Sequence, residues 1–196
     1  MKYYLIDTSA LIYLYIPDTP TKKITRKIEY LLQEKQKGNA FLFVPNFCIA
    51  EAFNTFAKYH YRYKKTAPDR ALSDGEYKLC CDKFQNDIKD GRIFYPYEMN
   101  NLHLSNVDFI TPFEHQWFLE REKEGKKEDW CLSTFDILFI SMGLELVRIV
   151  GRDNLFFVTR DKRINQICNI LRTADSNTRR KYKIPDYIIC PNCLPV

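Results

Sequence analysis

The amino-acid sequence predicts an α/β fold with a central, mostly parallel sheet. Short apolar runs at residues 3–6, 41–44 and 155–158 indicate buried strands, and each is followed by a segment with helical spacing of its apolar residues. This alternation is typical of a parallel sheet whose strands are joined by helices. The chain has 196 residues, of which 45% are hydrophobic, so we expect a single domain over 1–196 with an enlarged helical region at about 60–130.

Capping and breaking residues set the element boundaries in the first half of the chain. Asn46 is a suitable N-cap, Ser73 and Glu76 form a capping box, and Pro17 ends the first helix. The predicted elements are a strand at 2–6, helices at about 9–16 and 22–37, a strand at 41–44, helices at about 46–63 and 73–90, and a strand at 92–97.

The second half of the chain is less regular. Thr111-Pro112 precedes a predicted helix near 113–124, and the polar residues 122–129 indicate an exposed loop. The remaining predicted elements are an apolar helix at about 134–149, a strand at 155–158, a helix to about 171, a basic stretch at 172–183 and a last strand at 187–189.

Composition and charge exclude several classes of protein. No segment approaches the roughly 20 apolar residues of a membrane span. Asp7 interrupts the first apolar run, so no signal peptide is expected. Seven cysteines in a chain with a good core favour reduced thiols and a cytoplasmic location. The net charge of +5 permits a polyanionic partner without requiring one.

Two acids follow predicted strands. Asp7 comes after the run ending at Ile6, and Asp161 comes shortly after the run ending at Val158. In open parallel sheets, ligands bind in the crevice outside the carboxyl ends of the strands. Both acids are therefore candidates for a polar site, and simple N-caps are the alternative interpretation.

Two further acids stand alone on apolar helices. Glu51 is the only charged residue in 46–57, and Asp136 is the only one in 131–144. Burying an unpaired carboxylate costs several kcal/mol or more, so each must be neutral, paired or metal-bound. The alternatives are a capping box between Ser133 and Asp136, and a hydrogen bond from a core hydroxyl such as Thr55 to Glu51.

Four converging carboxylates would need a compensating cation. A site of carboxylates and waters suits Mg²⁺ or Mn²⁺, and the absence of histidine and cysteine beside most of these acids argues against zinc. A metal held in this way can activate water and stabilise a phosphorane, which is the chemistry of metal nucleases. Ser9 and Thr159 place supporting hydroxyls beside two of the acids.

The ordered set of motifs resembles the PIN-domain family. The resemblance rests on Asp7-Thr8-Ser9-Ala10-Leu11, Ala50-Glu51-Ala52, Phe135-Asp136-Ile137-Leu138-Phe139-Ile140 and Phe157-Val158-Thr159-Arg160-Asp161. It implies a three-layer α/β/α sandwich and a Mg²⁺- or Mn²⁺-dependent endoribonuclease. It also implies that Asp7, Glu51, Asp136 and Asp161 are the metal ligands and catalytic acids.

Many proteins of this family are VapC-type toxins of toxin–antitoxin pairs, which commonly dimerise and are silenced by an antitoxin. The resemblance therefore implies RNA, an antitoxin and a second copy of the chain as partners. This chain departs from the compact toxin pattern, because the stretch from Glu51 to Asp136 is long and the chain continues well beyond Asp161.

Basic residues near the acids are candidates for RNA binding. Lys58 and Arg62 alternate with tyrosines after Glu51, while Arg160, Lys162 and Arg163 flank Asp161. Cations of this kind contact phosphates and tyrosines stack on unpaired bases. A solvated helix end is the alternative for 58–65.

Competing hypotheses remain at this point. Cys190 and Cys193 form a single CxxC, for which buried reduced thiols are the default interpretation and zinc binding with Cys80 and Cys81 the alternative. A catalytically silent RNA- or partner-binding module on the same fold is the second functional class. A haloacid-dehalogenase-type phosphatase ranks third, because Ser9 stands where that chemistry needs a second Asp.

Overall fold

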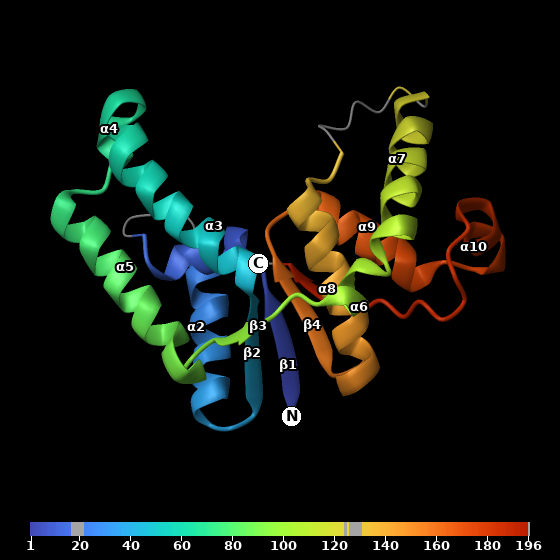
Figure 1. Ribbon diagram of the computed structural model, residues 1–196, viewed down its shortest axis with the longest axis horizontal. Helices are drawn as coiled ribbons and strands as arrows, with labels where there is room; N and C mark the ends of the chain where they lie inside the picture. The colour runs from blue at the N-terminus through green and yellow to red at the C-terminus, as the bar shows by residue number, and fades with distance from the viewer. Residues whose placement is uncertain (17–21, 124, 126–130, 196) are drawn as a thin grey trace. The chain divides into compact units, whose positions relative to one another are not determined.

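The computed structural model describes residues 1–16, 22–123, 125 and 131–195 (Figure 1). The chain divides into two compact units. Unit 1 comprises Met1–Glu98 with Val158–Arg160, and unit 2 comprises Met99–Phe157 with Asp161–Pro195. Whether 1–196 behaves as a single domain stays a prediction. The described part of the chain contains no helix long and apolar enough to cross a membrane.

A five-stranded sheet has the order β3-β2-β1-β4-β5. Its strands are β1 (Lys2–Ile6), β2 (Ala40–Pro45), β3 (Tyr95–Tyr97), β4 (Leu155–Thr159) and β5 (Asn192–Pro195). The pairs β1–β2 and β2–β3 are parallel, with Tyr4 opposite Leu42 and Phe43 opposite Tyr95. Parallel neighbours require crossover connections, which helices supply. The parallel sheet flanked by helices confirms the predicted α/β fold class.

Unit 1 contains the first helices of the chain. They are α1 (Thr8–Leu11), the 3₁₀ turn η1 (Ile12–Leu14), α2 (Lys22–Gln36), α3 (Asn46–Ala57), the π-helical turn η2 (Lys58–Arg62), α4 (Tyr63–Thr66), η3 (Pro68–Arg70), α5 (Asp74–Ile88) and η4 (Lys89–Gly91). The predicted helix at 46–63 is therefore divided at η2. Ser73 caps α5 in the predicted capping box, with Glu76 Oε2 accepting from Ser73 N at 2.8 Å.

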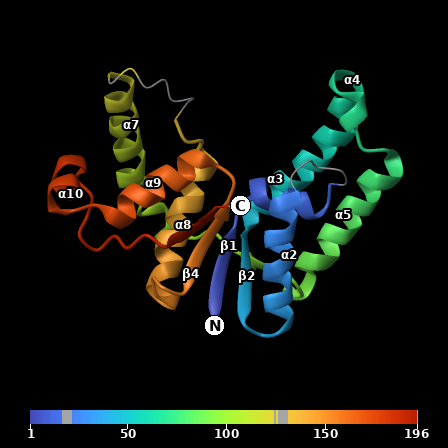
Figure 2. The same cartoon turned by 180° about the vertical axis from the view of Figure 1, so that it is seen from behind.

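An aromatic core joins α3 and α5, which lie side by side in Figures 1 and 2. The Tyr15 ring lies 5.8 Å from Phe56 and 5.1 Å from Phe84, in edge-on geometries that aromatic pairs favour. The Tyr15 hydroxyl donates to Asp87 Oδ2 at 2.8 Å. Burial, together with the charge of Asp87, raises the pKa of Tyr15 far above its ordinary value, so it remains a donor.

Unit 2 contains the remaining helices. They are α6 (Asn101–Leu104), α7 (Val107–Lys123), α8 (Thr134–Val150), α9 (Lys162–Thr173) and α10 (Ser176–Tyr182). The helix predicted near 113–124 begins earlier, at Val107, and contains Pro112 near its start. Most of the loop predicted at 122–129 lies outside the described residues, as does Pro17.

The strand predicted at 187–189 is wrong, because the last strand is β5 at Asn192–Pro195. Ile188 is buried within a turn, in which its N–H donates to Pro185 O at 3.1 Å, so its apolar character does not signal strand pairing. The basic stretch 172–183 contains α10, which Asp175 caps by accepting from Thr178 N at 2.8 Å.

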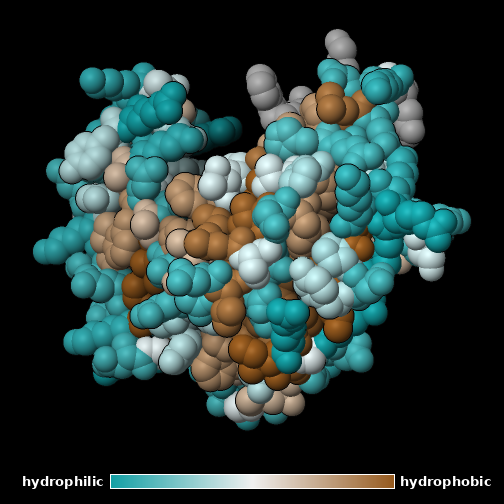
Figure 3. Space-filling view, turned by 45° about the vertical axis from the view of Figure 1, so that its right-hand side comes forward, coloured by the Kyte–Doolittle hydropathy of each residue, from teal (hydrophilic) through white to brown (hydrophobic). Residues whose placement is uncertain are grey.

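Hydrophilic residues surround smaller hydrophobic areas on the face shown in Figure 3. Large apolar side chains that reach the surface include Leu102 and Ile149, which are 65% and 77% exposed. Exposure of single apolar side chains is ordinary for a folded protein.

His103 makes the stability of unit 2 sensitive to pH. Its ring is buried, and Nδ1 accepts from Asn100 N at 2.8 Å, which only the neutral imidazole can do. Burial lowers the pKa of His103, although Glu145 opposes this shift. A lowered folded-state pKa means that the unfolded chain binds the proton more readily, so the contribution of His103 is complete above its ordinary pKa and is lost as the pH falls.

We expect His103→Asn to flatten this pH dependence, since an asparagine oxygen accepts the same bond without titrating. Denaturant unfolding at pH values from 8 to 5 measures the effect. The stability of the wild type relative to the variant should fall as the pH drops below about 6.5. A constant difference across this range would contradict the assignment.

Candidate metal centre

Asp7 follows β1 directly and is held by two hydroxyls. Its N–H donates to Val158 O at 3.0 Å, which fixes the residue at the end of the strand. The carboxylate is 8% exposed, and its Oδ2 accepts from Ser9 Oγ at 2.5 Å and from Thr159 Oγ1 at 2.8 Å. Asp7 occupies the N-cap position of α1, as the alternative interpretation proposed, but its side chain makes no capping hydrogen bond to the helix.

Ser9 is itself oriented by the backbone. Arg160 N donates to Ser9 Oγ at 3.1 Å, which leaves the serine proton to point at Asp7. This chain of bonds sets the direction of the Asp7 carboxylate. The predicted supporting roles of Ser9 and Thr159 therefore have a geometric basis within unit 1.

Glu51 on α3 accepts a hydrogen bond from the hydroxyl of Thr8, the residue after Asp7. Thr8 Oγ1 donates to Glu51 Oε2 at 2.8 Å. The core hydroxyl that binds Glu51 is thus that of Thr8, whereas the sequence suggested one such as Thr55. Consecutive residues of α1 therefore orient both acids of unit 1, Thr8 holding Glu51 and Ser9 holding Asp7.

The two acids lie close to Cys48. Side-chain ligand atoms of Asp7, Cys48 and Glu51 all lie within 4.8 Å of one another. Burial raises the pKa of the Cys48 thiol well above its ordinary value, and the charges of Asp7 and Glu51 act in the same direction. Two of the three donors are carboxylate oxygens, which are the ligands that Mg²⁺ and Mn²⁺ prefer.

Asp136 occupies the first turn of α8 in unit 2. Its Oδ2 accepts from Ser133 N at 2.8 Å and its N–H donates to Ser133 Oγ at 3.2 Å, so the capping box proposed as an alternative is present. Capping occupies one face of one oxygen and does not prevent a carboxylate from binding a metal. The capping box between Ser133 and Asp136 is thus confirmed, while metal binding by Asp136 stays a prediction.

Asp161 is the N-cap of α9 and also binds Arg163. Its Oδ1 accepts from Arg163 N at 2.7 Å, and its Oδ2 accepts from Arg163 Nη2 at 2.7 Å. Burial raises the pKa of Asp161, but the hydrogen bonds and charge of Arg163 outweigh burial and lower it overall. Asp161 is therefore an ionised carboxylate that already has a cation beside it.

Arg163 is the common neighbour of three acids in unit 2. Its pKa is raised mainly by the hydrogen bond to Asp161, with further contributions from the charges of Asp136 and Glu114. Glu114 on α7 is 3% exposed and its Oε1 accepts from Leu132 N at 2.9 Å. The structure thus adds Glu114 to the acids that surround this guanidinium.

The predicted RNA-binding residues are accessible. Lys58 and Arg62 are exposed on η2, and Lys162 is exposed at the start of α9. Arg160 is exposed and its guanidinium lies 4.5 Å from the centre of the Tyr13 ring, a cation–π geometry. Arg163 is half-buried and hydrogen-bonded to Asp161, and RNA binding by Arg163 stays a prediction.

The structure thus brings Asp7 and Glu51 together in unit 1, while Asp136 and Asp161 both act electrostatically on Arg163 in unit 2. Sequence reasoning missed Thr8 and Glu114. Thr8 stands within the motif that identified Asp7, but no spacing rule pairs it with a residue 43 positions away. Glu114 is the only Asp, Glu, Lys or Arg between Asp108 and Glu120, so the lone-acid signal that singled out Glu51 and Asp136 could have found it.

No protein-family model matches the chain, and no curated protein matches it. Among solved structures, it is similar to a chain in the crystal structure of VapBC2 from Rickettsia felis bound to a DNA fragment from their promoter. The two share 14% sequence identity, with 84% of this chain and 92% of that chain covered and a TM-score of 0.44.

Proposed function

We propose that the protein is a divalent-metal-dependent endoribonuclease acting on single-stranded RNA. Asp7, Glu51, Asp136 and Asp161 are its metal ligands, and Mg²⁺ or Mn²⁺ is the cofactor. The observation that supports the proposal best is the Asp7–Glu51 pair, in which two close carboxylates are each held by a hydroxyl from a consecutive residue. Such preorientation of neighbouring anions is costly unless a cation binds them.

The residues of the chain have separate tasks in this proposal. Thr8, Ser9 and Thr159 fix the carboxylates, and Arg163 holds Asp161 ionised. Thr159, whose hydroxyl binds Asp7, precedes Asp161 by two positions in the chain. Exposed Arg160, Lys162, Lys58 and Arg62 bind RNA phosphates. The bound metal supplies an activated water and stabilises charge on the scissile phosphate.

From the motif resemblance, we also propose that the protein is the toxin of a toxin–antitoxin pair. Its partners would be an antitoxin protein and a second copy of the chain. The neighbouring reading frame tests it. A small adjacent gene whose product binds this chain and suppresses its RNA cleavage supports this setting, and a product without effect on cleavage contradicts it.

Asp136→Asn separates metal binding from helix capping. An asparagine oxygen can still accept from Ser133 N, so the capping box survives while the negative charge is removed. We expect metal-stimulated cleavage of single-stranded RNA to fall on the order of tenfold to a hundredfold. The melting temperature without metal should change little, because the asparagine keeps the hydrogen bond from Ser133 N.

The control is Ser133→Ala, which removes the hydroxyl cap and keeps the carboxylate. This variant should lose stability and retain cleavage measured below its melting temperature. Full cleavage by Asp136→Asn would show that Asp136 acts only as a cap.

One observation favours a second candidate, a catalytically silent RNA- or partner-binding module. Arg163 contacts both oxygens of Asp161 and so already neutralises one predicted ligand. Calorimetric titration of the intact chain with Mn²⁺ distinguishes the two functions. Saturable binding that Asp7→Asn abolishes supports the nuclease, and RNA binding without any metal binding supports the silent module.

A further inference from the structure

Three metal-binding side chains of different chemistry meet in unit 2. They are Glu114 and His115, which are consecutive on α7, and Cys131, which precedes α8. A carboxylate oxygen, a ring nitrogen and the sulfur of these residues all lie within 4.8 Å of one another. The cluster therefore brings an oxygen, a nitrogen and a sulfur donor together, and none of its members is among the four acids of the proposed nuclease site.

One oxygen of Glu114 is buried without a hydrogen-bond donor. The residue is 3% exposed, and its Oε1 accepts from Leu132 N at 2.9 Å. Its Oε2 is closed to solvent and accepts no hydrogen bond from the residues that the structure describes. Buried polar atoms without partners are uncommon in proteins, and a carboxylate oxygen is costly to bury in this state. A cation bound at Oε2 would remove this cost.

The ring of His115 lies beside this oxygen. Its Nδ1 is 3.0 Å from Glu114 Oε2 and 3.0 Å from Thr111 O. A carbonyl oxygen can only accept, so the bond to Thr111 places the proton on Nδ1 and leaves the lone pair on Nε2. Histidines that bind metals commonly donate their other ring N–H to a carbonyl in this way. The His115 side chain is 54% exposed, which gives a metal a route from solvent into the cluster.

The backbone around Cys131 is tied to both neighbouring helices. Arg163 Nη1 of α9 donates to Cys131 O at 3.3 Å, and the next residue, Leu132, donates its N–H to Glu114 on α7. These bonds hold the thiol next to the carboxylate. A metal that binds here takes the thiolate form of Cys131 and releases the thiol proton to solvent.

We propose that Glu114, His115 and Cys131 bind a zinc ion, with water as the fourth ligand. Zinc accepts carboxylate, imidazole and thiolate ligands, whereas Mg²⁺ and Mn²⁺ prefer sites made of oxygen alone. The bound ion neutralises the buried Glu114 carboxylate and links α7 to the segment that leads into α8. This site is separate from the proposed centre at Asp7 and Glu51, and it does not depend on the nuclease function.

Titration of the intact, reduced chain with Co²⁺ tests the proposal. Cobalt replaces zinc in such sites, and its bond to a thiolate gives a charge-transfer band in the near-ultraviolet. We expect a saturable band that Zn²⁺ removes and that excess Mg²⁺ leaves unchanged. Cys131→Ala should abolish the band. His115→Ala and Glu114→Gln should each weaken cobalt binding on the order of tenfold or more, and the glutamine can still accept from Leu132 N.

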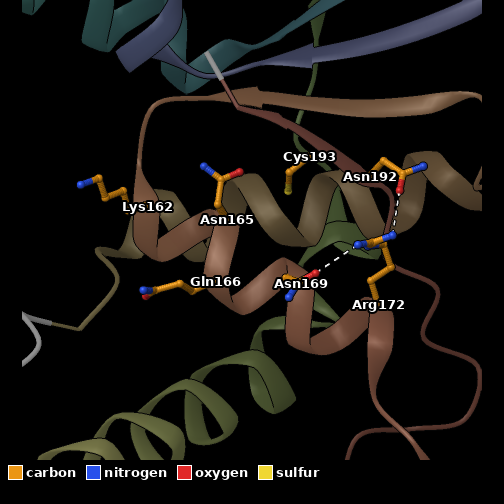
Figure 4. A pocket seen from close by; sticks show the side chains of 7 residues that line it. All are labelled: Lys162, Asn165, Gln166, Asn169, Arg172, Asn192 and Cys193. Atoms are coloured by element: carbon orange, nitrogen blue, oxygen red, sulfur yellow. Dashed lines mark hydrogen bonds between the residues drawn. The ribbon is translucent and has the colours of Figure 1, made fainter. Parts of the chain in front are cut away.

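Two other cysteines provide matched controls. Figure 4 shows Cys193 in a cavity beside α9, whose other lining residues are amides and cations and include no histidine or carboxylate. Cys48 lies beside Asp7 and Glu51, so it would give a thiolate band if cobalt entered the proposed nuclease site instead. Cys193→Ala and Cys48→Ala should both retain the band of the wild type.

Each outcome decides for or against the zinc site. A band that Cys131→Ala retains, or that Cys48→Ala or Cys193→Ala abolishes, overturns the proposal, as does a wild type without a band. His115→Ala keeps the test valid if Cys131→Ala does not fold, because its ring is largely exposed. Zinc should raise the melting temperature of the wild type and not that of His115→Ala, and equal increases would also overturn the proposal. No RNA cleavage is measured, so these results leave the nuclease proposal to its own tests.

Discussion

Replacing Asp7 with asparagine should abolish metal-stimulated RNA cleavage while the protein stays folded. The change removes one negative charge from the pair formed with Glu51, so the proposed ligand set binds a divalent cation more weakly. We expect a loss on the order of a hundredfold or more in cleavage of a single-stranded RNA in Mn²⁺. The amide oxygen still accepts from Ser9 or Thr159, so the melting temperature should shift little.

Asp82→Asn is the matched control for this variant. Asp82 is exposed on α5 of the same unit, so the substitution changes net charge by the same amount away from the proposed site. Cleavage by Asp82→Asn should equal that of the wild type. Undiminished cleavage by Asp7→Asn would refute its role as a ligand, and a collapse of its melting temperature would show that the carboxylate serves the fold.

Replacing Gly143 with alanine should cause a large loss of stability. A Cβ at this position of α8 would lie 1.8 Å from Phe157 Cε1 and 2.0 Å from Phe157 Cζ. Phe157 is fully buried and packs against Phe139 at 5.1 Å between ring centres, so it cannot move aside without displacing the core. We expect a destabilisation of about 2 kcal/mol or more in urea, after allowing for the helix propensity of alanine.

Gly75→Ala should have the opposite effect on stability. Gly75 lies in α5 with no atom within 4 Å of an added Cβ, so this substitution should stabilise the protein by up to about 1 kcal/mol.

Phe157→Leu in the Gly143→Ala background should recover part of the lost stability, which a double-mutant cycle measures. A Gly143→Ala variant as stable as the wild type would mean that α8 does not pack closely on β4.

The sequence by itself determined the fold class and most element positions. Apolar runs bounded by polar residues located β1, β2 and β4 to within a residue or two, because burial on both faces of a parallel strand selects continuous apolar segments. Capping boxes at Ser73 and Ser133 located α5 and α8, since these motifs act through neighbouring residues. The same local patterns identified Asp7, Glu51, Asp136 and Asp161 as unusual acids.

Only the tertiary structure decided which partners these acids have. Thr8 meets Glu51 because β1 pairs with β2, which leads into α3, and Thr159 meets Asp7 because β4 is the other neighbour of β1. No local rule relates residues so far apart in the chain. Local rules also misplaced the last strand. Ile188 is apolar because it is buried in a turn, and the sequence alone does not distinguish this from burial in a strand. The cavity beside α9 depends in the same way on packing between elements, which sequence periodicity does not encode.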